Sequence, residues 1–275
     1  MSDIVKIRLR SALDYQIEID GLTPDRTATL SQAEIAVLPV LIGSRRAVLG
    51  DLFTVDGERS SRLQIEGDVR NIDGLGAGTA GGELVIHGSA GRRVGAGMTG
   101  GSIDVGGDVG DEADLGMYGG ALRVTGHAGH RLGAAPAGAS KGTSGGEIVV
   151  TGSAGKEAGA RMRRGLIVIG GDAGADAGRA IIAGTLVVFG RTGADPGRAS
   201  KRGSIVALGG IDVPATYEYA CTYQPTYVRM LLTYLRRRYG VASPDGTLDG
   251  SYARYCGDAS GPGKGEILAY TPGNR

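Results

Sequence analysis

The 275-residue chain has no tryptophan, two phenylalanines, two cysteines and three histidines. Because hydrophobic residues make up 41% of the chain and aromatic residues only 5%, leucine, isoleucine, valine and alanine must fill the core. Two cysteines without a CxxC pair exclude a disulfide scaffold. The opening segment MSDIVKIRLRSALDYQIEIDG lacks the apolar centre of a signal peptide, and no apolar run is long enough to span a bilayer. We therefore expect a soluble, cytoplasmic protein with no membrane partner.

An excess of charge of one sign is also missing. The 30 basic residues balance 29 acidic ones, so the net charge is +1 and the chain lacks the electrostatic footprint of a nucleic-acid binder. His127 and His130 lie three apart in a glycine-rich corner with no cysteine nearby, which predicts no metal site. No Ser–His–Asp arrangement and no phosphate-binding loop can be assembled. We expect no catalytic residue in this chain.

Glycine is abundant, with 52 residues, and it recurs with a period. Seven segments begin at Gly82, Gly101, Gly120, Gly146, Gly165, Gly184 and Gly203, and a degenerate copy precedes them from Ser61. Successive starts are 19 residues apart, except for one step of 26 that carries seven extra residues within 134–145. The shared pattern is an apolar-any-apolar triplet followed by Gly-x-x-Gly-x-x-x-Gly, as in GELVIHGSAGRRVG from Gly82. Such self-similarity is typical of a repeat architecture.

The outer members of every triplet are apolar and the middle member varies, which indicates a strand with one buried face. Each strand is expected to pair in parallel with its copy one repeat later, at about 4.8 Å. We predict an all-β fold, a right-handed parallel β-helix: a solenoid of about eight glycine-rich coils over residues 61–210. The left-handed helix of hexapeptide acyltransferases fits less well, because no six-residue subperiod is visible.

The flanking segments differ from the repeats. Residues 1–60 are predicted to be a small N-terminal cap, in which Ser31 and Glu34 fit a capping box that opens a short helix before Pro39. Residues 211–275 are predicted to be a tyrosine-rich C-terminal extension with one helix, from Tyr227 to a stop at Gly240. The rest of the extension is not periodic. It is either a cap for the far end of the rod or an arm that docks on a partner.

Charged residues also repeat. Glu157, Asp176 and Asp195 share one position, with Arg179 and Arg198 three residues after the two aspartates, so a surface ladder of salt bridges is expected. Two pairs of basic residues also occupy one repeat position, two repeats apart: Arg163, Arg164, Lys201 and Arg202. With Arg161 and Arg198 they are expected to form a basic stripe. The stripe is either a solvated edge that discourages strand pairing or a contact for an acidic partner or ligand.

These coils resemble the GXGXG domain, which is shared by glutamate synthases and by the C subunits of formylmethanofuran dehydrogenases. The leading segment SQAEIAVLPVLIGSRRAVLGDLFTVDG resembles the stretch before the coils in those C subunits, so the resemblance covers about residues 1–210. The tyrosine-rich tail looks like that of the bacterial counterpart, the C subunit of the formyltransferase/hydrolase complex of methylotrophs.

The resemblance implies a non-catalytic scaffold subunit. The implied complex moves a formyl group from formyl-tetrahydromethanopterin to a methanofuran-type carrier and releases formate in one-carbon metabolism. Its implied partners are an amidohydrolase-like subunit that holds zinc, a formyltransferase subunit and a further subunit, with no cofactor bound by this chain. The carrier bears a polyglutamate chain, for which Arg163, Arg164, Lys201 and Arg202 are candidate contacts.

Two other functions remain open. The chain is alternatively a glutamate synthase-type GXGXG structural domain. A β-helical enzyme acting on polysaccharide fits less well, because it needs a cluster of charged residues on one sheet face. The middle strand residues are mostly valine, with Asp104 and Arg123 as exceptions.

Overall fold

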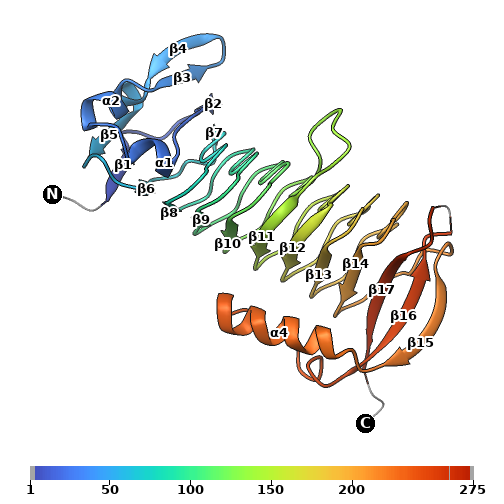
Figure 1. The fold of residues 1–275 in the computed structure, drawn as a ribbon. Coiled ribbons are helices and arrows are strands. Elements are labelled where there is room, and N and C mark those ends of the chain that lie inside the picture. The colour runs from blue at the N-terminus through green and yellow to red at the C-terminus, as the bar shows by residue number, and fades with distance from the viewer. Residues whose placement is uncertain (1–3, 260, 273–275) are drawn as a thin grey trace.

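The computed structural model describes residues 4–259 and 261–272, so the outermost ends of the predicted cap and extension lie outside the described residues. The chain forms an elongated rod, with its first residues at one end and its last residues at the other (Figure 1). The repeats stack side by side along the rod, each contributing one strand to the same sheet. None of the helices in the described part has the length and apolar character needed to cross a bilayer.

The repeat strands pair in parallel and in register, as predicted. Leu84 lies beside Ile103, Ile103 beside Leu122 and Leu122 beside Ile148. Apolar side chains at equivalent positions therefore stack into columns inside the rod, where the outer members of the triplets are buried. The ladder consists of β6 (Arg62–Glu66), β8 (Glu83–Ile86), β9 (Ser102–Val105), β10 (Ala121–Val124), β11 (Ser144–Val150), β12 (Arg164–Ile169), β13 (Thr185–Val188) and β14 (Ser204–Ala207).

The predicted fold class is wrong. The described residues form a 13-stranded mixed sheet and a separate four-stranded sheet, with four helices, rather than an all-β parallel β-helix with a short helix in the cap and one helix in the extension. In the seven full repeats only one side carries a regular strand; the degenerate first repeat also contributes the two-residue β7 to the smaller sheet. A second side has single bridges, such as Ala90 to Val109, and the third side consists of turns. Glycines such as Gly95 and Gly97 adopt positive φ there, which ends any extended run, so repeated strands on all sides do not form.

The N-terminal segment continues the large sheet. β1 (Val5–Leu9) lies between β6, to which it is parallel, and the antiparallel edge strand β5 (Phe53–Asp56). The predicted capping box is confirmed: Ser31 and Glu34 cap α2 (Gln32–Ala36), and Pro39 opens the next strand. The other elements of this segment are β2 (Ile17–Glu18), α1 (Pro24–Thr27), β3 (Pro39–Ile42), β4 (Arg45–Val48), α3 (Leu49–Leu52) and β7 (Ile72–Asp73).

The C-terminal extension also joins the large sheet. β17 (Gly265–Thr271) pairs in parallel with β14, and β16 (Ser251–Gly257) and β15 (Glu218–Tyr223) follow in antiparallel order. The predicted helix is confirmed as α4 (Thr226–Tyr239), which ends at Gly240 with a left-handed φ of 68°. The two strands after α4 were not predicted. Whether the boundaries at 60/61 and 210/211 mark separate domains stays a prediction.

α4 lies along the outer face of the sheet (Figure 1). Val228, Leu232 and Leu235 of the helix are buried against a second apolar cluster on that face. The strands supply the middle members of four successive triplets to this cluster: Val149, Val168, Val187 and Val206. Nearer the N-terminus the corresponding residues Val85, Asp104 and Arg123 are partly or fully exposed. The change from Asp104 and Arg123 to an unbroken run of valines, beginning at Val149, marks where the helix covers the sheet.

Candidate functional site

The predicted basic stripe lies on the surface. Arg163, Arg164, Lys201 and Arg202 are all exposed, just before or at the start of β12 and β14. The repeat between them carries Ile182 and Ala183 at the equivalent positions, so the cations form two pairs rather than an unbroken row. Among the described residues, no carboxylate forms a salt bridge with any of the four. Two pairs of free cations on one edge can attract an extended acidic ligand or an acidic surface.

The predicted salt-bridge ladder is present for two of its three acidic residues, and its pairs join neighbouring repeats; Asp195 forms no salt bridge with another described residue. Arg179 donates to Glu157 at 3.0 Å, and Arg198 pairs with Asp176 at 2.8 Å. Each arginine thus reaches the acid of the preceding repeat rather than the aspartate three residues before it. Arg198 is neutralised in this way and does not extend the basic stripe. The acidic residues have φ near +60°, so each projects from a tight turn.

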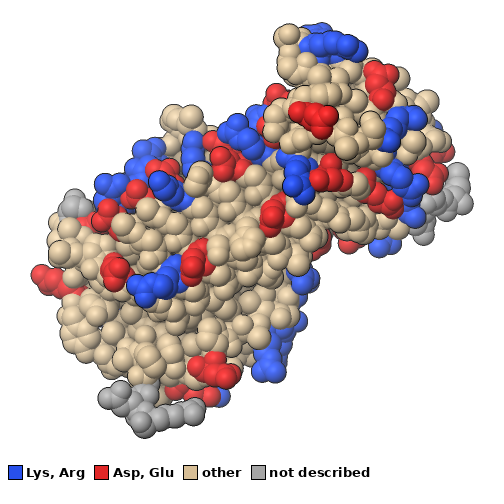
Figure 2. Space-filling model, turned by 180° about the vertical axis from the view of Figure 1, so that it is seen from behind, with Lys and Arg blue, Asp and Glu red and all other residues tan. Residues whose placement is uncertain are grey.

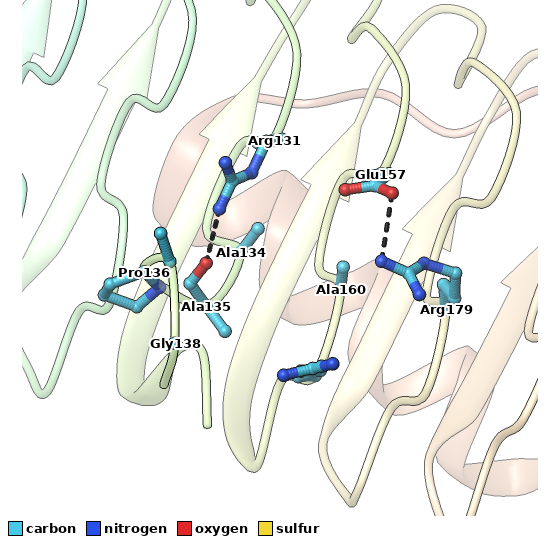
Figure 3. Close-up of a pocket in the computed structure, with 10 residues that line it drawn as sticks. Arg131, Ala134, Ala135, Pro136, Gly138, Glu157, Ala160 and Arg179 are labelled. Atoms are coloured by element: carbon cyan, nitrogen blue, oxygen red, sulfur yellow. Dashed lines mark hydrogen bonds and ion pairs between the residues drawn. The ribbon is translucent and has the colours of Figure 1, made fainter. Parts of the chain in front are cut away.

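The seven-residue insertion forms a loop that stands out from the rod and borders a pocket of about 260 Å³ (Figures 1 and 3). Arg131 holds the loop by donating to the Ala135 carbonyl at 2.7 Å, and Arg161 donates to the Ala139 carbonyl at 2.9 Å. Arg179 and Glu157 close the other side as an ion pair. The lining residues include three guanidinium groups and one carboxylate. Because Arg131 also pairs with Glu112 at 3.0 Å, Arg161 is the one lining cation without a carboxylate partner among the described residues. None of the lining residues is a serine, cysteine, histidine or lysine.

The same loop contains a pattern that the sequence reasoning missed. Gly138-Ala139-Ser140-Lys141-Gly142 has the Gly-x-Ser-x-Gly spacing of hydrolase nucleophile elbows. That motif works only on a sharp turn from a strand into a helix, where the serine hydroxyl is presented to a histidine. Here residues 138–142 lie in a loop that leads into β11, so the pattern carries no nucleophilic role.

The histidines of the repeats take part in a relay of side chain to backbone hydrogen bonds. The Nδ1 atoms of His127 and His130 each accept a backbone N–H from the next repeat, at 3.0 Å. Elsewhere in the same relay a serine or aspartate accepts the equivalent N–H, as Ser89, Asp108 and Asp172 do. These histidines therefore bond the corners of adjacent repeats together. No group of three metal-ligating side chains occurs in the part of the chain that the structure describes.

One carboxyl group lies inside the rod. Asp114 is fully buried and takes the place that Gly95 has in the preceding repeat, with φ of 52°. Neither carboxyl oxygen has a hydrogen-bond partner among the described residues, and burial raises the pKa of this group well above its usual value. The group lies in the core and not in a pocket, so it can act on no ligand.

Charged side chains gather along the edges of the rod, while much of the flank that Figure 2 shows carries none. The face shown in Figure 2 thus has a broad area without charged residues and charged borders. Nothing in the described geometry places a nucleophile beside a general base.

Comparison with known proteins gives two curated relatives, whereas no family model matches the chain. The chain is 36% identical over 88 residues to the C subunit of the formyltransferase/hydrolase complex Fhc of Methylorubrum extorquens, which covers 32% of this chain and 33% of the relative. It is 33% identical over 99 residues to the C subunit of molybdenum-containing formylmethanofuran dehydrogenase 1 of Methanosarcina barkeri, which covers 34% and 33%. The matches thus span about a third of each curated relative.

A solved structure matches nearly the whole chain. It is the crystal structure of the formyltransferase/hydrolase complex (FhcABCD) from Methylorubrum extorquens in complex with methylofuran. One chain of that complex superposes on this one with a TM-score of 0.89 and 35% identity, covering 97% of this chain and 100% of that chain.

Proposed function

The chain belongs to the family formed by the C subunits of formyltransferase/hydrolase complexes and formylmethanofuran dehydrogenases, and from that premise we propose that it is a scaffold subunit without an active site of its own. In this proposal it assembles with an amidohydrolase-like subunit, a formyltransferase subunit and a further subunit. The complex moves formyl from formyl-tetrahydromethanopterin to a methanofuran-type carrier and releases formate. The zinc for hydrolysis belongs to the amidohydrolase-like partner. A cytoplasmic location stays a prediction.

The observation that carries this proposal is the match over 97% of the chain, at 35% identity, to a chain solved within the FhcABCD complex. The architecture supports it physically. The strands of the repeats, β1 and β17 all belong to one sheet, so the rod is a rigid body that can hold other subunits at fixed positions. His127 and His130 accept hydrogen bonds from the backbone of the next repeat, so these side chains bond one repeat to the next.

We further propose that the basic stripe contacts the acidic chain of the carrier or an acidic partner surface. Arg163, Arg164, Lys201 and Arg202 suit that role because they are exposed and have no carboxylate partner among the described residues. The arginine-lined pocket lies close by, since Arg161 precedes Arg163 by two residues. The four cations of the stripe, with Arg161 in the pocket, carry positive charge without a carboxylate partner among the described residues, and such charge attracts polyanions over a distance of about one Debye length.

Native mass spectrometry of the untagged protein, purified gently from its own cells, tests the proposal. The expected result is an assembly several times heavier than the 28.0 kDa chain that contains amidohydrolase-like and formyltransferase-like subunits. A free monomer or a homo-oligomer under the same conditions would refute the scaffold function.

A further inference from the structure

The last strand of the large sheet, β15, has an open edge. It pairs with β16 on one side and is the terminal strand on the other (Figure 1). All six of its residues, Glu218–Tyr223, are exposed. Such an edge presents a row of backbone N–H and C=O groups that another extended segment can bond.

The opposite edge of the same sheet is protected. At that end α2 packs on β5, and the Gln32 side chain donates a hydrogen bond of 2.6 Å to the Val55 carbonyl. Soluble proteins otherwise protect edges with proline, lysine or β-bulges. Glu218–Tyr223 has the sequence EYACTY, which contains no proline or lysine. Its register with β16 shifts once, between Tyr219 and Cys221, and neither a helix nor a side chain is seen to cap the strand as Gln32 caps β5 within the described residues. The difference between the two ends points to a partner at β15.

The surroundings of β15 are those of an interface. Tyr219 is 59% exposed, Tyr223 is 38% exposed, and Met230 on the adjoining α4 is 68% exposed. Tyrosine and methionine are enriched where proteins meet, and an exposed group of them indicates a contact surface. Glu218 is the single charged residue of the strand.

We propose that β15 is the docking edge for an extended segment of another subunit, which adds a strand to the sheet. The segment has few charges, alternates apolar and polar side chains, and brings a lysine or arginine opposite Glu218. A second copy of this chain meets that requirement poorly, because EYACTY offers no basic residue. The inference rests on the proposed function, since it requires other subunits. It is also consistent with the extension being part of the fold shared with a chain solved within a complex.

Hydrogen exchange measured by mass spectrometry tests the inference directly. The full chain alone and the purified complex are compared over the peptide that spans Glu218–Tyr223. We expect the outward amides of β15 to exchange at least about tenfold more slowly in the complex, because each gains a backbone partner. Equal exchange in a complex that does contain the other subunits overturns the inference and leaves the proposed function standing. Purification without any other subunit overturns both.

Substitutions on the edge of β15 test the same inference through the affinity between subunits. The double variant Tyr219→Lys with Thr222→Lys places charges on the edge, and we expect it to weaken subunit association at least about tenfold. Tyr118→Lys is the matched control, because Tyr118 is 66% exposed but lies outside every strand. Should the double variant fail to fold, Glu218→Lys tests the same edge through its charge. Wild-type affinity in the double variant, or in Glu218→Lys, contradicts the inference. Slower amide exchange in the free chain that increases with its concentration also contradicts it, because it indicates that β15 pairs with a second copy.

Discussion

The hydroxyl of Tyr234 on α4 donates a hydrogen bond of 2.8 Å to the Oε1 atom of Glu147 on β11, 87 residues earlier in the chain. Tyr239, at the end of the same helix, donates to the other oxygen of this carboxylate. Burial and this negative charge both raise the pKa of the Tyr239 hydroxyl, so both tyrosines remain donors at neutral pH. One carboxylate thus holds the C-terminal half of the helix on the sheet.

Replacing Glu147 with alanine removes the acceptor of both tyrosines. We expect Glu147→Ala to lower the free energy of unfolding by about 1–3 kcal/mol, because hydrogen bonds to a charged group are lost and a partly buried hydroxyl is left without a partner. Denaturant unfolding measures this change. Glu83→Ala is the control, since Glu83 has the equivalent place on β8 and forms an exposed ion pair with Arg62, worth about 0–1 kcal/mol. Equal effects of the two substitutions would contradict the role given to Glu147.

The buried apolar face of α4 should contribute more to the free energy of unfolding than its exposed face. Leu232 is 1% exposed against the valine cluster, and we expect Leu232→Ala to lower the free energy of unfolding by about 2–5 kcal/mol. Met230 is on the same helix but 68% exposed, so Met230→Ala should change the free energy of unfolding by about 0.5 kcal/mol or less. Thermal unfolding of both variants checks the difference, and a similar loss in both would show that the helix is not anchored through Leu232.

Replacing the buried Asp114 with glycine should stabilise the protein. Glycine adopts the left-handed φ without strain and removes a carboxyl group that has no partner among the described residues, so Asp114→Gly should raise the free energy of unfolding by about 1–3 kcal/mol at pH 7. Urea denaturation of the full chain measures the gain. A loss of stability would contradict the cost assigned to the unpaired carboxyl group.

The increase in the free energy of unfolding caused by Asp114→Gly should be larger at pH 7 than at pH 3. Burial raises the pKa of Asp114 in the folded chain, so the folded state holds its proton more tightly than the unfolded state. The pH-dependent part of the penalty from this group is therefore absent below the unfolded pKa of about 3.9 and grows as pH rises above it, while the cost of burying an unpaired carboxyl group is present at both pH values. Urea denaturation at pH 3 and pH 7 should show a larger advantage for Asp114→Gly at pH 7. In Asp114→Asn, which cannot titrate, this pH-dependent contribution should vanish.

Charge reversal tests the basic stripe. Replacing Arg163, Arg164, Lys201 and Arg202 with glutamate in the assembled complex should weaken binding of the carrier by about tenfold or more, with the effect falling at high salt. Steady-state kinetics with the carrier as the varied substrate would report this as a higher KM. Arg45→Glu with Arg46→Glu is the control, because both arginines are exposed on β4 at the far end of the rod. Unchanged kinetics of the fourfold variant would remove the stripe from the proposed function.

Local pattern by itself determined where the strands of the repeats lie and how those strands pair. The apolar outer members of each triplet recur every 19 residues, and a chain that buries them can do so only by stacking equivalent positions such as Leu84 and Ile103. The Ser31 cap and the helix before Gly240 followed from local signals as well. These features depend on residues close in sequence, whose spacing is visible without the fold.

Only the tertiary structure decided which side of each repeat carries a strand, which charged residues pair and where α4 lies. The glycines at positive φ restrict regular strands to one side of each repeat, and the pairing of Arg179 with Glu157 depends on the stacking distance between repeats. The position of α4 depends on contacts with residues 60 or more positions away, such as Val168 and Glu147. Contacts of that kind leave little signal in sequence spacing, because their energy comes from apolar surface that is buried only when distant segments meet.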